Sequence, residues 1–240
     1  MDPELKNIEQ ALREKATAGK AAFLPRFFKT GTGEYGEGDR FLGVTVPEQR
    51  TIAKAWHSKI SPAQAEVLLQ SEWHECRLTA LFILVHHYEK AGSDEKRQQI
   101  VDLYLRNTHR VNNWDLVDSS AYRILGRHLW GKDKILLDTL ARSEDLWKQR
   151  ISIIATMYFI RKGEVADTIR IAEILLHHKH DLIHKAVGWM LREAAKKEMI
   201  TVRVFLDRHH RHMPRTMLRY AIERFDEQTR QAYLKGRPAQ

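Results

Sequence analysis

The sequence of 240 residues has one cysteine, Cys76, and lacks any long apolar run. A single cysteine excludes a disulfide framework or a zinc site built from several cysteines within one chain, and it fits a reducing cytoplasm. A helix that crosses a membrane needs roughly 20 consecutive apolar residues, so no membrane association is expected. Residues 1–20 are charged and are expected to form an amphipathic helix rather than a signal peptide.

Proline and strand signals are also scarce. Only six prolines occur, and none lies between Pro62 and Pro214. Alternating β-branched runs are rare, whereas apolar residues recur at helical spacing, which predicts an all-α protein. Helices are expected at residues 2–18, 21–29, 47–58, 62–70, 73–90, 94–106, 114–129, 133–142, 146–161, 164–177, 181–197, 199–208, 214–224 and 226–234. Ser61 is expected to cap the helix that opens at Pro62, and Gly92, Gly131 and Gly163 are expected to follow helix ends.

Half of the twelve glycines fall within the first 43 residues, most of them in the polar segment 30–40. This segment is expected to be a mobile loop. It does not match a phosphate-binding loop, because no strand precedes it and no Gly-Lys-Ser/Thr follows it.

Five segments align loosely and suggest an internal repeat. Four begin with a cation, at Arg77, Arg150, Lys185 and Arg215, and the fifth begins with Asp118 in the same phase. Their spacing is close to that of two-helix HEAT-like repeats, which stack into a curved solenoid. We therefore expect a single HEAT-like domain over residues 1–240. Its concave groove would be basic, interrupted by one carboxylate; the alternative is that these cations are ordinary surface residues.

The net charge of +9 is unevenly distributed along the chain. Residues 1–120 carry 16 Lys and Arg against 17 Asp and Glu, whereas residues 121–240 carry 24 against 14. A basic half suggests a polyanionic partner, with nucleic acid favoured over an anionic membrane surface. Charge that serves only solubility is the alternative explanation.

Candidate chemistry concentrates in three of the segments. Trp114 and Asp118 are four residues apart, so on a helix they share one face. Asp115, three residues before Asp118, is expected to cap the start of the helix instead. Arg150 begins a later segment, and Trp189 follows Gly188, where another backbone or a ligand could approach closely. Taken singly, such residues are usually core tryptophans, caps and solvated cations, so the combination is more informative than its parts.

Three stretches carry a resemblance to a known family: Asn-Trp-Asp-Leu-Val-Asp at 113–118, Leu-Trp-Lys-Gln-Arg at 146–150 and Lys-Ala-Val-Gly-Trp-Met-Leu-Arg-Glu at 185–193. A weaker match is Arg-Phe-Phe-Lys at 26–29. The sequence resembles the AlkD family of bacterial alkylpurine DNA glycosylases, built from HEAT-like repeats, in register from about residue 20 to about residue 225.

The resemblance implies roles for individual residues. Asp118 matches the catalytic aspartate and Arg150 the arginine that works beside it. Trp114 and Trp189 match the aromatic residues that contact the lesion nucleotide. Phe27 stands where the family often has tyrosine, so it keeps an aromatic face without the hydroxyl.

The implied function is excision of positively charged N3- or N7-alkylated purines from double-stranded DNA by hydrolysis of the N-glycosidic bond. The repeat alignment adds Lys185, Arg215 and Arg77 as expected DNA contacts. No lysine stands out as a Schiff-base nucleophile, so a monofunctional enzyme without a cofactor, acting as a monomer, is expected. The alternatives are a HEAT-like protein that binds DNA or RNA without catalysis and a protein–protein scaffold. Asp118 argues against the non-catalytic DNA- or RNA-binding protein, because a carboxylate in a phosphate-binding groove lowers the affinity for nucleic acid.

Histidine-rich stretches could suggest a metal. His180 and His184 have the i, i+4 spacing of helical ligands, but neither cysteines nor a metalloprotease-type glutamate accompanies them, so no metal site is predicted. These histidines are expected to add pH-dependent positive charge instead. Cys76 lies in an apolar run and is not expected to be a nucleophile.

Overall fold

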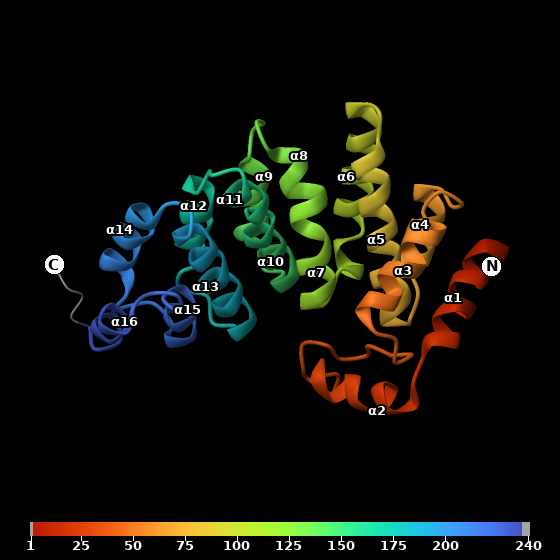
Figure 1. Ribbon diagram of the computed structural model, residues 1–240, viewed down its shortest axis with the longest axis horizontal. Helices are drawn as coiled ribbons and strands as arrows, with labels where there is room; N and C mark the ends of the chain where they lie inside the picture. The colour runs from red at the N-terminus through yellow and green to blue at the C-terminus, as the bar shows by residue number, and fades with distance from the viewer. Residues whose placement is uncertain (1, 237–240) are drawn as a thin grey trace. The chain divides into compact units, whose positions relative to one another are not determined.

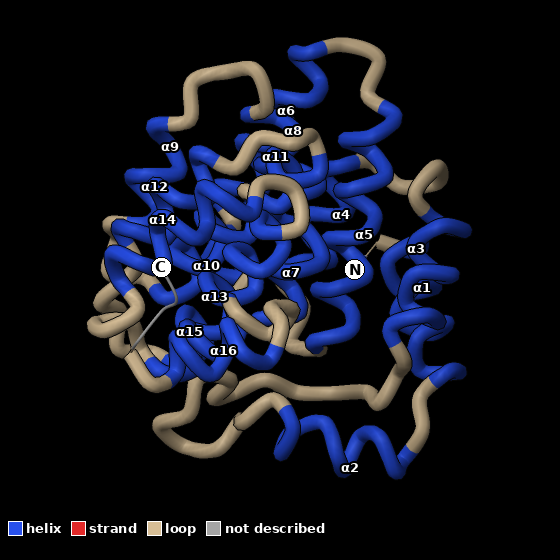
Figure 2. The backbone as a smooth tube through the Cα atoms, turned by 60° about the vertical axis from the view of Figure 1, so that its left-hand side comes forward, coloured by secondary structure: helices blue, strands red, loops and turns tan. Residues whose placement is uncertain are grey.

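The computed structural model describes residues 2–236, and within them it contains helices and loops but no β-strand (Figures 1 and 2). The predicted all-α class is therefore confirmed. The chain divides into two compact units, residues 1–120 and residues 121–240. The single domain over residues 1–240 remains a prediction. None of the helices within residues 2–236 is long and apolar enough to span a lipid bilayer.

The first unit is built around one apolar helix, α5. Its helices are α1 (Pro3–Lys15), α2 (Ala18–Phe27), α3 (Val46–Trp56), α4 (Pro62–Leu69), α5 (His74–Lys90), α6 (Asp94–Arg106) and α7 (Trp114–Ala121), with a 3-10 turn at Thr108–Arg110. Every residue of α5 from His74 to Val85 is buried, because α1, α3, α4 and α6 pack against it. Such a helix shows little amphipathic pattern, since it is covered on several sides.

Two helix starts in this unit are set by capping boxes. The Thr45 hydroxyl accepts from the backbone N–H of Glu48, whose carboxylate accepts from the N–H of Thr45. Ser61 and Gln64 form the same reciprocal pair at α4, with Pro62 at the first helical position. These contacts satisfy N–H groups that have no partner inside the helix. The predicted cap at Ser61 is confirmed.

The second unit contains α8 (Arg127–Leu129), α9 (Ile135–Ala141), α10 (Leu146–Ala155), α11 (Met157–Arg161), α12 (Ala166–Ile174), α13 (Asp181–Ala195), α14 (Met199–His209), α15 (Arg215–Ala221) and α16 (Glu227–Leu234), preceded by a π-helical turn at Tyr122–Gly126. Helix α13 packs against α10, α14 and α15. The predicted helix ends at Gly131 and Gly163 are confirmed, since these glycines lie two positions after the last residues of α8 and α11.

Two predicted continuous helices are interrupted in the structure. The helix expected over 114–129 contains the π-helical turn. In this turn Gly126 lies so close to α10 that an added Cβ would be 2.1 Å from the Ala155 carbonyl oxygen. The helix expected over 146–161 is interrupted at Thr156, whose hydroxyl donates to the Ile153 carbonyl oxygen at 2.7 Å. Hydroxyl groups that bond to the preceding turn compete with regular helix hydrogen bonds.

Gly188 allows α13 and α15 to approach closely, as the sequence predicts. A Cβ added at this position would lie 2.5 Å from both the Met217 carbonyl oxygen and the Tyr220 Cβ. Real Cβ atoms do not reach such distances, so the two helices would have to separate.

We predict that Gly188→Ala destabilises the protein by about 1–3 kcal/mol, because an extra methyl group overpacks a close helix contact. Gly19→Ala is the matched control, since Gly19 lies in α2 with nothing within 4 Å of an added Cβ. Urea unfolding of the whole chain measures both variants. Equal unfolding midpoints would contradict the packing described for Gly188.

Candidate functional site

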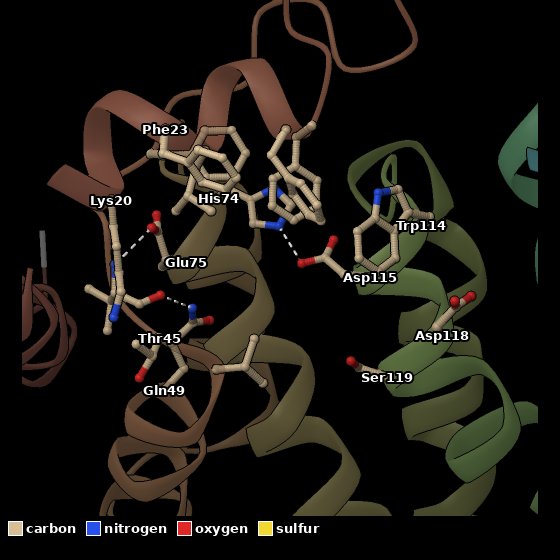
Figure 3. A pocket seen from close by; sticks show the side chains of 16 residues that line it. Lys20, Phe23, Thr45, Gln49, His74, Glu75, Trp114, Asp115, Asp118 and Ser119 are labelled. Carbon is tan, nitrogen blue, oxygen red and sulfur yellow. Dashed lines mark hydrogen bonds and ion pairs between the residues drawn. The ribbon is translucent and has the colours of Figure 1, made fainter.

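A cavity of about 460 Å³ opens in the first unit between α2, α3, α5 and α7. We call it the aromatic pocket, because four phenylalanines and a tryptophan are among the residues that line it (Figure 3). Its lining includes Phe23, Phe27, Phe28, Phe41, Trp114 and Asp118. All of them lie within residues 2–120, so one unit supplies the whole pocket.

The rings form a continuous stack. Trp114 lies on Phe28 with ring centroids 5.2 Å apart, and Phe28 lies on Phe41 at 5.0 Å. Phe27 meets Trp114 edge to face at 5.9 Å. These separations are those of favourable aromatic pairs. Phe28 and Phe41 are buried and support the stack, whereas Phe27 and Phe23 are 49% and 58% exposed.

Helix α7 brings the predicted tryptophan and aspartate to the pocket. Trp114 and Asp118 both line it, as their spacing of four residues predicts. Asp115 and Ser119 line the same wall one residue further along the helix. The structure thus brings together three of the predicted site residues, namely Trp114, Asp118 and Phe27; their roles remain predictions.

A buried ion network centred on His74 joins α5 to this wall of the pocket. Its Nδ1 lies 3.0 Å from the Asp39 Oδ2 and its Nε2 lies 2.8 Å from the Asp115 Oδ2. Carboxylates accept hydrogen bonds, so both ring nitrogens donate and His74 is an imidazolium. Burial acts to lower the pKa of His74, but the charges and hydrogen bonds of Asp115 and Asp39 outweigh it and raise the pKa to about 9.

Arg77 completes the network and balances its charge. Its Nη2 lies 2.5 Å from the Asp39 Oδ1, and its Nη1 donates to backbone carbonyl oxygens. Burial acts to raise the pKa of Asp39, but the hydrogen bond from His74 and the charge of Arg77 hold it at about 2. Two carboxylates therefore face two cations. The sequence-based expectation that Arg77 lies on a DNA-facing surface is wrong: it is 2% exposed, because Asp39 needs a buried partner.

Asn113 connects the network to the start of α7. Its side-chain Nδ2 donates to the Asp39 Oδ2 at 3.0 Å, and its Oδ1 accepts from the Trp114 backbone N–H at 2.8 Å. Asp115 accepts from the Leu116 N–H at 2.8 Å while it binds His74, so it is an ion-pair partner as well as a local acceptor. The network thereby fixes the helix that presents Trp114 to the pocket.

Glu75 lies on the side of the aromatic pocket opposite α7 and holds the chain there in place (Figure 3). It is 1% exposed, and its carboxylate accepts from the backbone N–H groups of Leu42, Gly43 and Val44 at 2.9, 2.8 and 3.2 Å. Gly43 has φ +94°, and a Cβ there would lie 2.5 Å from the Thr17 carbonyl oxygen. These contacts hold the chain that carries Phe41 and Val44 against α5.

The Gly-rich segment 30–40 is a loop, as predicted, and hydrogen bonds hold it at its middle and at its C-terminal end. The Gly36 N–H donates to the Lys29 carbonyl oxygen at 3.0 Å, and Asp39 belongs to the buried network. Its mobility remains a prediction.

Two residues of the buried network, His74 and Asp39, were not predicted from the sequence. The available signal was the set of charges at the start of the apolar helix α5, because buried charges require partners.

The other predicted site residues lie in the second unit. Arg150, on α10, is 5% exposed and its Nη1 donates to the Leu182 carbonyl oxygen at the start of α13. Lys185 pairs with Asp181 at 2.7 Å and Trp189 is half-buried, both on α13. Arg215 is exposed, and its Nη2 donates to the Leu234 carbonyl oxygen at 2.9 Å.

The histidines before α13 make local hydrogen bonds, and the single cysteine is buried. The His178 Nδ1 accepts from the His180 backbone N–H at 2.9 Å, and the His180 Nδ1 accepts from the Leu182 N–H at 3.1 Å. Within residues 2–236, no group of three or more His, Cys, Asp or Glu side chains could hold a metal ion. Cys76 is buried in α5, and burial raises the pKa of its thiol to about 12.

We predict that stability falls at alkaline pH because of His74. The pKa of His74 is raised on folding, so its stabilising contribution is complete below pH 6.5 and is lost as the pH rises through about 9. The expected loss of unfolding free energy over this window is about 3 kcal/mol.

His74→Gln should lack this pH dependence and be less stable at neutral pH by roughly 3–5 kcal/mol, since it leaves a buried carboxylate unpaired. Urea unfolding from pH 5 to pH 9 measures both; a flat wild-type profile would disprove the assignment.

Comparison with known proteins adds the family. No curated protein matches the chain significantly. Three solved structures share the fold, at TM-scores of 0.69, 0.57 and 0.53: a predicted DNA alkylation repair enzyme from Enterococcus faecalis, AlkD2 from Streptococcus mutans and a second Streptococcus mutans protein, smu.31. They are 16%, 16% and 14% identical to this chain and cover 89%, 86% and 93% of it and 98%, 97% and 98% of their own lengths. These likenesses confirm the predicted helical-repeat fold.

The family itself is established by sequence. The model of the family described as DNA alkylation repair enzyme matches residues 8–225, which is most of the chain. The match includes α7 and the aromatic pocket as well as α10 and α13. The protein therefore belongs to the DNA alkylation repair enzyme family.

Proposed function

We propose that the protein is a monofunctional DNA glycosylase that hydrolyses the N-glycosidic bond of N3- or N7-alkylated purines in double-stranded DNA. The observation that carries the proposal is the position of Asp118, whose carboxylate lines an aromatic pocket together with Trp114 and Phe27. Membership of a DNA alkylation repair family supports DNA as the partner.

The chemistry required of the protein is modest. A purine alkylated at N3 or N7 is positively charged, so it leaves without protonation by an acid. Departure of the base creates an oxocarbenium-like sugar, which a fixed carboxylate stabilises, and the same carboxylate can orient the attacking water. We assign both tasks to Asp118. We propose Arg150 as the assisting arginine, and neither task needs a cofactor.

The aromatic rings provide selectivity for a charged base. A cation over a ring face gains about 0.5–2 kcal/mol, more when water is excluded. Trp114 supplies such a face, held in place by the buried Phe28. We propose Trp189, on α13, as a further aromatic contact to the lesion nucleotide. Phe27 offers a ring but no hydroxyl, so it contributes contact area without a hydrogen bond.

The second unit would bind the phosphate backbone. It carries 24 Lys and Arg against 14 Asp and Glu, whereas the first unit is nearly neutral. Lys185 and Arg215 are the proposed phosphate contacts, because both side chains reach the surface. Arg77 is buried, so we assign it to holding Asp39 instead of DNA. The proposed enzyme acts as a monomer.

Asp118→Asn is expected to lower the rate of base release by at least about 100-fold, because removal of the carboxylate charge removes stabilisation of the developing cation. Binding to DNA should be retained or slightly strengthened. Release of 7-methylguanine from methylated duplex DNA under single-turnover conditions measures the rate. Asp102→Asn, an exposed change on α6, is the control. A variant at Asp118 that keeps the wild-type rate would contradict the proposal.

Lys185→Gln is expected to weaken DNA binding equally for damaged and undamaged duplexes. Each phosphate contact contributes a slope of about −0.9 to the dependence of log K on log salt, so the slope should become shallower by about that amount. Fluorescence anisotropy over a salt series gives the slope. Lys6→Gln, on the exposed face of α1, should leave it unchanged. An unchanged slope for Lys185→Gln would remove this residue from the interface.

A further inference from the structure

We infer that the first unit holds a second binding site, one for a phosphate anion, at the end of α5 remote from the aromatic pocket. The site is a cavity of about 400 Å³ lined by Lys90, His87 and Lys96 among others. Its ligand is a small phosphorylated molecule or a phosphate group of a nucleic acid, which share this chemistry. The inference does not depend on the proposed glycosylase activity, because the two cavities share no lining residue.

The two sites lie at opposite ends of one helix. His74, at the start of α5, lines the aromatic pocket, whereas Lys90 is the last residue of the same helix. A helix rises about 1.5 Å per residue, so the 17 residues of α5 place its ends about 25 Å apart. A phosphate bound beside Lys90 therefore leaves the aromatic pocket unoccupied.

The wall of this cavity carries positive charge that no carboxylate balances. Lys90 lines it from the end of α5 and Lys96 from the first turns of α6, and His87 adds a third basic side chain. Within residues 2–236, neither lysine forms an ion pair with Asp or Glu, and Lys90 does not pair with its neighbour Glu89. A concave surface that carries charge of one sign attracts ions of the opposite sign, so the cavity favours an anion.

The ammonium group of Lys90 is held by a neutral histidine instead of a carboxylate. The His57 Nδ1 lies 2.8 Å from the Lys54 carbonyl oxygen, which can only accept, so Nδ1 carries the proton. The His57 Nε2 is therefore an acceptor, and the Lys90 Nζ donates to it at 2.6 Å. This contact orients the ammonium without neutralising its charge. Because an ammonium has three N–H donors, two are left for an anion.

His87 gives the cavity a donor that an anion would strengthen. Its Nε2 lies 2.9 Å from the Ile60 carbonyl oxygen, so this nitrogen donates and the ring is fixed in orientation. Burial lowers the pKa of His87, and the charges of His57 and Lys90 contribute to the lowering. A bound anion offsets the repulsion from these charges, which allows the second ring nitrogen of His87 to take up a proton.

A phosphate group suits this set of donors and this volume. Phosphate has several strong acceptor oxygens, and lysine binds it as a point charge, so two lysines and a histidine on one wall can share one group. Cavities that hold small molecules span roughly 300–1,000 Å³. The volume of about 400 Å³ therefore leaves room for the part of the ligand that carries the phosphate. Pro62, Ala91 and Ile100 supply an apolar wall for that part.

The test is an NMR titration of the whole chain with inorganic phosphate at pH 7.5, with chloride at equal ionic strength as the reference. The backbone amide signals of Ala91 and Gly92, at the cavity, should shift along one saturating curve. Lys90→Gln should weaken the apparent affinity about tenfold, because a charge-assisted hydrogen bond is lost. Lys6→Gln removes the same charge from the exposed face of α1 and should leave the affinity unchanged.

Two results would overturn the inference: amide signals that respond no more to phosphate than to chloride, and an equal loss of affinity in Lys90→Gln and Lys6→Gln. Competition identifies the source of the phosphate. Displacement of inorganic phosphate by an undamaged duplex supports a nucleic acid, whereas displacement by deoxyadenosine 5′-monophosphate alone supports a small phosphorylated molecule.

The outcome is separable from the proposed function. Lys90→Gln should release 7-methylguanine at the wild-type rate, because Lys90 lies at the end of α5 away from Asp118. A protein that binds phosphate at this cavity but releases no alkylated base keeps the inference and loses the proposed function. A protein that releases 7-methylguanine without binding phosphate there loses the inference alone.

Discussion

The imidazolium of His74, held between the carboxylates of Asp39 and Asp115, is the interaction on which the aromatic pocket depends. It joins three segments that are distant in sequence: the end of the Gly-rich loop, the start of α5 and the start of α7. Arg77 supplies the second positive charge, so the group is neutral as a whole. Removing any one member would leave a charge buried without a partner, at a cost of roughly 3–5 kcal/mol.

The pocket follows from this network and from Glu75. Asn113 transmits the position of Asp39 to the first backbone N–H of α7, which sets where Trp114 points. Glu75 binds the N–H groups of Leu42, Gly43 and Val44, so the chain that carries Phe41 is fixed to the same helix. Asp118 then lies one helical turn beyond Trp114. The start of the helix that carries both residues is held by the buried ion pairs and hydrogen bonds of the network. Such support is what a preorganised carboxylate requires.

Local features were predictable from sequence and long-range pairings were not. The all-α class, the cap at Ser61 and the shared face of Trp114 and Asp118 depend on residues a few positions apart, where periodicity and capping rules apply. The partner of Asn113 is 74 residues away, at Asp39, and no local pattern indicates it. For the same reason Arg77, read as a surface cation at the head of a repeat, proved to be buried.

The protonation state of His74 tests this account most directly. Nitrogen-15 NMR of the histidine side chains in the labelled protein distinguishes an imidazolium from a neutral ring. We expect both His74 ring nitrogens to carry protons at pH 7.5 and to titrate with a pKa of about 9. A His74 ring with one unprotonated nitrogen at pH 7.5 would contradict the charged network and, with it, the support proposed for Trp114 and Asp118.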